Sequence, residues 1–319
     1  MSHGRAVSLM ILITLLWSMA GVVTRHLDSA VGFEITFWRS AFSAISLAIA
    51  LSALRGLGFW RRLLYAPKVI WISGVCWSIM FTAFMVAITL TTVANVLIIL
   101  ALGPLITALF TRFFLNHRLP AFTWVAIALA GIGIASMFLH EGDETFSIVG
   151  TLVSLAVPLA GAVNYSLLQY VGLGKTHKPG ISGNQPIQDM LQAVLIGAIL
   201  STLLTLPLSL PIHASIHDLG LLAILGVFQL SLPCLLVVRL SRELSAPEIT
   251  LLSQLELLFG VTWAWLWAGE DLSANSLVGG SMVLGALIAN ELARMLRDRR
   301  AAARRLNCLE PAEVSLLPK

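Results

Sequence analysis

The longest stretch of this chain without a charged side chain runs from Val69 to Thr111, and most of its 43 residues are apolar. The hydrocarbon core of a bilayer is about 30 Å thick, and an α-helix of roughly 20 apolar residues crosses it. The stretch is therefore too long for one crossing, but it fits two crossings joined by a tight turn near residues 89–92. Because a backbone in lipid must bond its own polar groups, both crossings are expected to be helical.

Composition extends this conclusion to all 319 residues. Hydrophobic residues make up 58% of the chain and charged residues only 11%, whereas soluble domains carry roughly 25% charged residues. So little polar surface cannot cover a water-soluble globule of this size. A cytosolic enzyme, a disordered chain and an ordinary nucleic-acid-binding domain are therefore excluded, and no nucleic acid is expected among the partners. The three cysteines have no spacing typical of a disulfide framework or a zinc site.

Apolar runs of membrane-spanning length recur along the sequence. We predict an all-α integral membrane protein with ten transmembrane helices, at residues 6–24, 33–54, 69–90, 92–115, 122–139, 147–168, 190–210, 219–238, 247–268 and 273–295. The first run is interpreted as a retained helix rather than a signal peptide, because it is long for one and many equally apolar runs follow it.

The basic residues predict the orientation. With ten crossings, 18 of the 20 Lys and Arg residues fall on the side that holds both termini, and only Arg25 and Arg39 fall on the other. Since cytoplasmic loops are rich in Lys and Arg, we expect both termini to be cytoplasmic, with the protein in a bacterial inner membrane. The basic tail, residues 297–319, either binds anionic lipid headgroups or only fixes this topology.

The two halves of the chain resemble each other weakly. Residues 92–119 align without gaps on residues 245–272. The predicted units are residues 1–140 and 141–296, with five helices each. Because five is odd, the second unit enters the membrane from the opposite side, as in the inverted repeats of many secondary transporters.

Several short motifs resemble the drug/metabolite transporter superfamily, and within it the EamA-type proteins. The motifs that carry the resemblance are Leu15–Gly21, Phe37–Ser40, Leu244–Glu248, Leu255-Glu256 and Gly269–Leu272. Members typically have a proline after the glutamate that matches Glu256, and this chain has Leu257 there. The similarity extends to about residue 296.

The resemblance implies a ten-helix transporter built from two five-helix repeats. It implies export or exchange of a small metabolite, either amino-acid-like or amphiphilic, by alternating access and without a cofactor. The oligomeric state stays open between monomer and homodimer. The alternatives are a non-transporting sensor or scaffold and, less favoured, an intramembrane enzyme. No His-Glu-x-x-His motif is present, and none of the seven histidines falls in the middle of a predicted helix.

Glu256 is the first candidate site residue, because a carboxylate in the middle of a predicted crossing is costly and usually serves a pathway or a proton. Protons are therefore a candidate second substrate. The other interpretation is a hydrogen-bonded structural glutamate. Ser253, Gly260 and Trp263 share its helix face. This stripe either lines a cavity or allows close helix packing.

Other polar groups lie in apolar runs and need partners there. They are candidate ligand contacts or ties between helices, namely Asn95, Asn164, Tyr165, Gln229 and Gln254. Trp17 and Trp77 lie deep in their predicted helices, where they either form a wall for a ligand or belong to the core.

Arg39 is the last candidate. It either attracts an anionic group, or snorkels or pairs with Glu34. Prolines are predicted to interrupt three helices, at Pro104, Pro158 and Pro233, and Pro207 lies near the end of another. Such kinks either mark hinge or binding points or have no such role. The pair His213 and His217, beside Asp218, has metal-ligand spacing but lies in a short outer loop, so no metal is expected.

Overall fold

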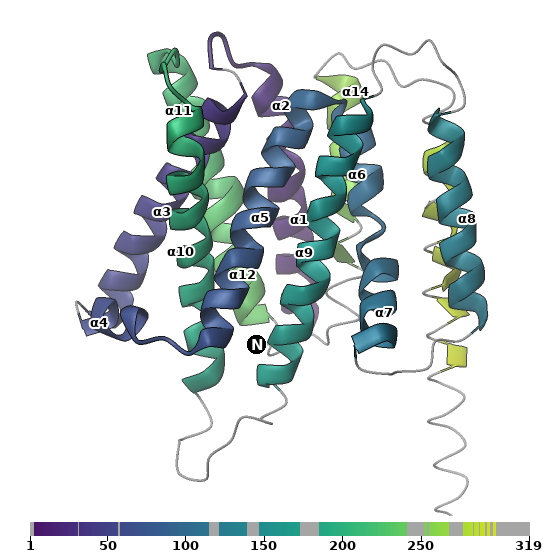
Figure 1. Cartoon of the computed structure of the whole chain (residues 1–319), viewed down its shortest axis with the longest axis horizontal. Coiled ribbons are helices and arrows are strands. Elements are labelled where there is room, and N and C mark those ends of the chain that lie inside the picture. The colour runs from purple at the N-terminus through teal and green to yellow at the C-terminus, as the bar shows by residue number, and fades with distance from the viewer. Residues whose placement is uncertain are drawn as a thin grey trace, which may run out of the picture.

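The computed structural model describes residues 3–30, 32–56, 58–114, 121–138, 147–172 and 185–240, together with residues 252–297 apart from 254, 268–276, 283, 287, 291, 294 and 295. Every regular element in this described part is helical (Figure 1). Five helical segments are long and apolar enough to cross a membrane, namely Gly4–Arg25, Phe33–Arg55, Lys68–Leu90, Met190–Leu208 and Ile216–Leu240. Shorter apolar helices are Asn95–Thr107, Trp124–Gly133, Ile148–Asn164 and Leu277–Asn290.

The helices follow the predicted order along the chain. The first half contains α1 (His3–Ser18), α2 (Ala20–Arg25), α3 (Phe33–Arg55), α4 (Gly58–Leu64), α5 (Lys68–Leu90), α6 (Val93–Leu100), α7 (Gly103–Phe114) and α8 (Ala121–Phe138). The second half contains α9 (Ile148–Gly172), α10 (Gln185–Thr205), η1 (Leu206–Leu208), α11 (Ile216–Ile224), η2 (Leu225–Ser231), α12 (Leu232–Leu240) and α14 (Leu255–Leu266).

The structure differs from the predicted helices at several points. The first predicted helix is divided at Met19, and the fourth is interrupted between Leu100 and Gly103, just before Pro104. Proline lacks the N–H that would continue the helical ladder, so a break on its N-terminal side is expected. The short helix α4 was not predicted. Pro158 lies inside the continuous helix α9, so the chain does not break there.

The helices form one bundle with α5 near its centre (Figure 1). Helix α5 packs between α9 and α10, α10 also packs on α3, and α3 packs on α11 and η2. Helix α1 packs on α12 and α14, while α6 and α7 pack on α9. A Cβ added to Gly74 of α5 would lie 2.5 Å from the Ile196 side chain of α10, so a larger residue would force these helices apart.

Helix α9 runs in the opposite direction to α1, α2 and α5. The first turn of α9 reaches the last turn of α5, because a Cβ at Gly150 would lie 2.9 Å from Thr91. The Thr91 carbonyl also accepts a hydrogen bond from Arg25 at the end of α2. Helix α9 therefore begins where α1 and α2 end, and it runs antiparallel to them.

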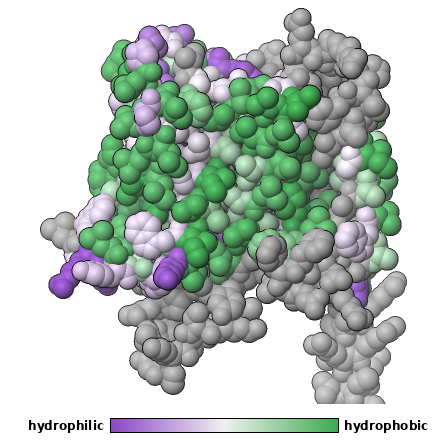
Figure 2. Space-filling view, in the orientation of Figure 1, coloured by the Kyte–Doolittle hydropathy of each residue, from purple (hydrophilic) through white to green (hydrophobic). Residues whose placement is uncertain are grey.

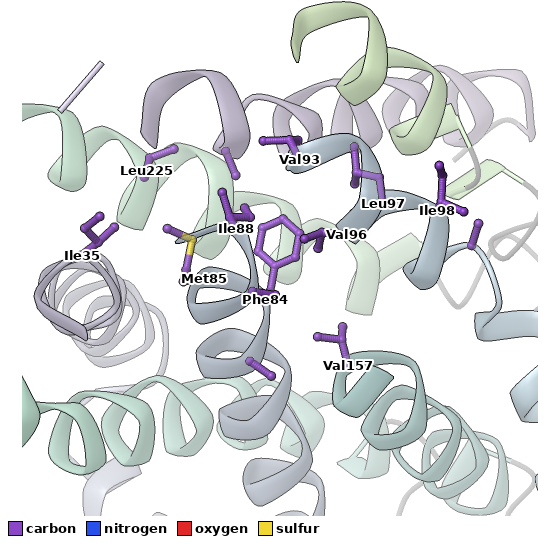
Figure 3. Packing of buried hydrophobic residues seen from close by; sticks show 14 of the residues in the cluster. Ile35, Phe84, Met85, Ile88, Val93, Val96, Leu97, Ile98, Val157 and Leu225 are labelled. Atoms are coloured by element: carbon purple, nitrogen blue, oxygen red, sulfur yellow. The ribbon is translucent and has the colours of Figure 1, made fainter. Parts of the chain in front are cut away.

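The largest apolar cluster fills the bundle around α5 and α6 (Figure 3). It joins residues from α2, α3, α5, α6, α9 and α11, among them Ala20, Ile35, Phe84, Val96, Val157 and Leu225. A second cluster occupies the other end of α5, where it packs against α3, α4 and α10.

The outer surface is apolar, and polar side chains are buried among the apolar clusters of the interior. Large hydrophobic side chains face outward along several helices, such as Ile49, Val149, Leu152, Leu203 and Leu204. Figure 2 shows a broad green band of hydrophobic residues on one face, with hydrophilic residues toward its two ends. Exposed apolar surface of this extent marks a membrane-facing protein, and the helix lengths agree with that assignment.

Candidate functional site

Arg39 lies at the junction of α3, α5 and η2, and its side chain is only 1% exposed. Its Nη1 donates to Oε1 of Gln229 at 3.1 Å, and its Nη2 donates to the Phe81 carbonyl at 2.9 Å. The guanidinium carbon lies 5.9 Å from the centroid of the Phe84 ring, within the range of a cation–π contact. Arg39 therefore does not snorkel to the membrane surface.

Gln229 connects this arginine to the first helix. Its Nε2 donates to the Trp17 carbonyl at 3.2 Å, while its Oε1 accepts from Arg39. The Trp17 indole packs against the apolar clusters beside α1 and α12. Three of the predicted site residues are thus joined in one chain of contacts across α1, η2 and α3.

The sequence explains why the backbone around Gln229 is a π-helix. Pro233 has no N–H to donate to the Gln229 carbonyl four residues earlier, so the α-helical ladder is interrupted. The Ser231 hydroxyl donates to the Gly226 carbonyl at 2.9 Å, five residues back. Gly226 also permits close packing, since an added Cβ would lie 2.6 Å from the Arg39 carbonyl oxygen. Such π segments occur frequently at functional sites.

Glu256 lies in the first turn of α14 and is partly buried. The Cys234 thiol, one turn beyond Gln229, interacts electrostatically with both Arg39 and Glu256. Ser253 is helical and partly buried in the preceding turn, and Gln254 lies outside the described residues.

The far part of α14 contacts the first helix. Trp263 Nε1 donates to the Ser18 hydroxyl at 3.1 Å, and the Trp263 ring stacks on Trp267 with centroids 4.7 Å apart. Gly260, on the predicted face with Glu256, is buried against the Leu97 side chain of α6. The stripe of small and aromatic residues on α14 therefore packs between α1 and α6.

Asn164 forms a separate polar point between α9 and α5. It is fully buried, and its Oδ1 accepts from the Ser73 hydroxyl at 2.5 Å. In the described part of the chain, its Nδ2 has no hydrogen-bond partner. Tyr165 follows it in α9, and its side chain lies outside the described part.

Two candidates lie within supporting structure. Trp77 is 4% exposed in the apolar cluster of α5 and α10, with its ring centroid 5.4 Å from that of Phe81. Asn95 lies in the first turn of α6, where its backbone N–H donates to Thr92 and its side-chain amide donates to Thr91. Both positions suit packing and helix capping.

Two buried carboxylates that the sequence analysis did not select hold the outer connections together. Glu34 Oε1 accepts the backbone N–H groups of His213 and Ala214, at 3.0 and 2.8 Å. Asp218 accepts four backbone N–H groups, from Asp28, Ser29, Ala30 and Ser215. Glu34 is therefore engaged with the loop before α11 rather than with Arg39.

Asp28, His217 and Asp218 lie close enough together to hold a metal ion. Both carboxylate oxygens of Asp218 already accept backbone hydrogen bonds, and His217 Nδ1 lies 2.9 Å from Asp28 Oδ2. The arrangement is satisfied as a structural cluster, so it gives no reason to revise the expectation that no metal binds here.

A belt of buried hydroxyls was also not predicted. It ties α3 to α10 and η2 through Ser40–Ser201, Ser43–Ser231 and Ser46–Ser231 contacts, and α5 to α10 through a Thr82–Ser201 contact, all of 2.8–2.9 Å. Single serines in apolar runs do not stand out in a sequence. Their regular spacing on α3, every third residue, is the pattern that identifies them as one helix face.

Comparison with known proteins adds a family to this geometry. Residues 4–139 and 186–290, most of the chain, match the EamA-like transporter family. The chain is similar to the pseudopaline exporter CntI of two Pseudomonas aeruginosa strains, UCBPP-PA14 and PAO1. The identity is 24% over 259 residues, covering 80% of this chain and 84% of each exporter.

A solved crystal structure has a similar fold. Its TM-score is 0.60 at 17% sequence identity, and the match covers 92% of this chain and 99% of the other. This likeness concerns the fold alone.

Proposed function

Because the chain belongs to the EamA-like transporter family, a family of integral membrane transporters and not of enzymes, we propose that it exports or exchanges a small metabolite by alternating access. We further propose that it does so as two inverted five-helix units, residues 1–140 and 141–296. The similarity to a named metabolite exporter supports this substrate class and an outward direction of transport.

The observation that carries the proposal is the symmetry of the helix contacts. In the proposed pairing, α1–α2 corresponds to α9, α3 to α10, α5 to α11–α12, and α6–α7 to α14. If the two units are related by symmetry, each contact between helices must recur between their counterparts. The contact of α5 with α9 recurs as that of α12 with α1, and the contact of α5 with α10 recurs as that of η2 with α3. The contact of α6 with α9 recurs as that of α14 with α1.

The directions of the helices support the inversion. Helix α9 begins at the membrane side where α1 and α2 end. Ser40, near the start of α3, contacts Ser201, near the end of α10. The paired helices are therefore antiparallel, as inverted repeats require. Two bundles of opposite orientation can exchange conformations, and this exchange exposes a site between them to each side in turn.

The proposed pathway follows the junction where the two units meet. Arg39 of the first unit contacts Gln229 of the second, and Trp263 of the second contacts Ser18 of the first. Trp17 joins this junction through its carbonyl, which accepts from Gln229, and Glu256 and Arg39 both act on the Cys234 thiol. The proposed orientation keeps both termini in the cytoplasm, and the proposed location is the bacterial inner membrane.

Counterflow in proteoliposomes tests the function across many solutes at once. Vesicles containing the purified protein are loaded with a bacterial metabolite extract and diluted into the same extract labelled with ¹³C. Mass spectrometry then measures which labelled solutes enter. We expect protein-dependent entry of one or a few solutes. Entry of none above the rate in protein-free vesicles would contradict the proposal.

A further inference from the structure

Arg39 is a buried cation whose charge is not neutralised by any described residue. Its hydrogen-bond and ring partners in the described part of the chain are an amide oxygen, a backbone carbonyl and an aromatic ring, contributed by Gln229, Phe81 and Phe84. All three are neutral, and the Cys234 thiol, which interacts electrostatically with Arg39, is not a carboxylate that could form an ion pair with it. A buried charge is costly unless an opposite charge and full hydrogen bonding compensate it.

The hydrogen bonding of Arg39 is also incomplete. A guanidinium carries five N–H donors, and the buried Nε of Arg39 has no hydrogen-bond partner among the residues that the structure describes. The N–H of Nε and one N–H of the neighbouring Nη point to the same side of the planar group, in the spacing that a carboxylate accepts with its two oxygens. The Nη on this edge is Nη2, which donates one of its two N–H groups to the Phe81 carbonyl. What Arg39 lacks among the described residues is thus an anionic acceptor at Nε.

Neighbouring residues make this position suitable for a transient ligand. Arg39 lies six residues from the start of α3, about 9 Å from its outer end. The outer connections held by Glu34 and Asp218 lie beyond that end. On the opposite side of Arg39, Gln229 belongs to a π segment, a backbone form that occurs often at functional sites.

We propose that Arg39, with Gln229 beside it, binds the carboxylate of an anionic or zwitterionic substrate during transport. This inference rests on the proposed function and specifies its substrate class. When the carboxylate binds, it supplies the missing acceptor for Nε and the missing negative charge. Because Arg39 contacts α5 and η2 as well as its own helix, the bound ligand connects helices of both proposed units.

The test compares acids with their amides, which have the same shape but lack the carboxylate. Counterflow is measured with labelled alanine and alaninamide, phenylalanine and phenylalaninamide, and phenylacetate and phenylacetamide. Competition by chloride and by inorganic phosphate is measured in the same assay. We expect the wild-type protein to exchange at least one acid about ten- to a hundredfold faster than its amide. We also expect chloride and phosphate to compete weakly.

Arg39→Gln is expected to abolish the preference for the acid. Arg39→Lys is expected to retain part of it, since lysine keeps the positive charge but lacks the planar set of N–H donors of the guanidinium. Arg55→Gln, at the other end of the same helix, is the matched control and is expected to keep the wild-type preference. Size-exclusion chromatography identifies the folded variants. If Arg39→Gln does not fold, the acid-to-amide preference of Arg39→Lys is compared with that of the wild-type protein instead. A purely structural Arg39 would lower both rates and leave their ratio unchanged.

Three results would overturn the inference. The wild-type protein exchanges no acid of the panel faster than its amide, a folded Arg39 variant keeps the wild-type preference, or chloride or phosphate competes more strongly than the acids. A protein that exchanges other metabolites without preferring acids refutes only this inference. A protein that exchanges no solute at all refutes the proposed function.

Discussion

At the scale of single residues, Asp218 is the clearest structural residue of the outer face. Its carboxylate is fully buried and accepts four backbone N–H groups from two separate parts of the chain. Asp218→Ala leaves these donors without an acceptor, so we expect the free energy of unfolding to fall by about 2–4 kcal/mol.

Thermal unfolding of the detergent-solubilised variants measures this loss. Asp28→Ala is the control, because its exposed carboxylate faces His217 and a surface pair of this kind contributes about 1 kcal/mol or less. Equal loss of stability in the two variants would show that the backbone contacts of Asp218 contribute little.

Glu256 is the residue at which we expect transport to couple to protons. It is partly buried in the first turn of α14, and it acts on the same thiol as Arg39. Glutamine keeps the shape of glutamate but cannot exchange a proton. In Glu256→Gln we therefore expect counterflow to persist, while net transport driven by a pH gradient falls roughly tenfold or more.

Proteoliposomes with an imposed pH gradient distinguish these two modes, and Asp28→Asn provides a control acid at the surface. If Glu256→Gln retained the full response to the gradient, Glu256 would not be the coupling residue.

The sequence analysis selected some of the residues that form buried polar contacts and missed others for a physical reason. Arg39, Gln229 and Glu256 stand out because charged and amide groups are rare in apolar runs. Glu34 and Asp218 do not, because both lie near helix ends, where an acid is ordinary. Their role depends on backbone groups as many as 190 positions away, and no local pattern reveals such contacts.

At the scale of helices, the sequence predicted the long elements well. The predicted helix at residues 69–90 is α5 (Lys68–Leu90), and that at 33–54 is α3 (Phe33–Arg55). The thickness of the bilayer sets these lengths, so apolar run length is sufficient to find them. The helix α4 and the break between α6 and α7 involve few residues and follow from local packing, which run length does not encode.

The π segment offers a test at this scale through two glycines of one span. A Cβ at Gly226 would lie 2.6 Å from the Arg39 carbonyl oxygen and 2.7 Å from the Phe42 Cβ, whereas a Cβ at Gly220 meets nothing within 4 Å. We expect Gly226→Ala to push η2 away from α3 and to lower the free energy of unfolding by about 1–3 kcal/mol.

Gly220→Ala is the matched control, and it is expected to leave stability unchanged or to raise it slightly, because alanine favours helix. Thermal unfolding and the acid-to-amide preference are measured on both variants. Equal behaviour of the two would show that the close approach of η2 to α3 is not required.

At the scale of the whole molecule, the account depends on an outer surface that differs from that of soluble proteins. Leucine, isoleucine and valine face outward, and buried serines, Arg39, Asn164 and Gln229 form polar contacts between helices whose interior is otherwise apolar. Composition predicted the apolar surface, because so few charged residues cannot cover a soluble protein. It did not predict which helices meet, since that depends on shape at contacts such as Gly74 with Ile196.

Alternating access requires the outer ends of the two units to separate in each cycle. Asp28, just after α2, and His217, in α11, face each other across these ends at 2.9 Å, and both side chains are more than half exposed. A disulfide between cysteines at these two positions would prevent separation. The double variant Asp28→Cys/His217→Cys is made in a protein whose three native cysteines are replaced by alanine, with each single variant as a control.

The most direct measurement is counterflow by this double variant in proteoliposomes, before oxidation, after oxidation and after reduction. We expect oxidation to stop exchange, reduction to restore it, and both single variants to be insensitive. Exchange that continues at the unoxidised rate when the disulfide is fully formed would contradict alternating access by two moving units.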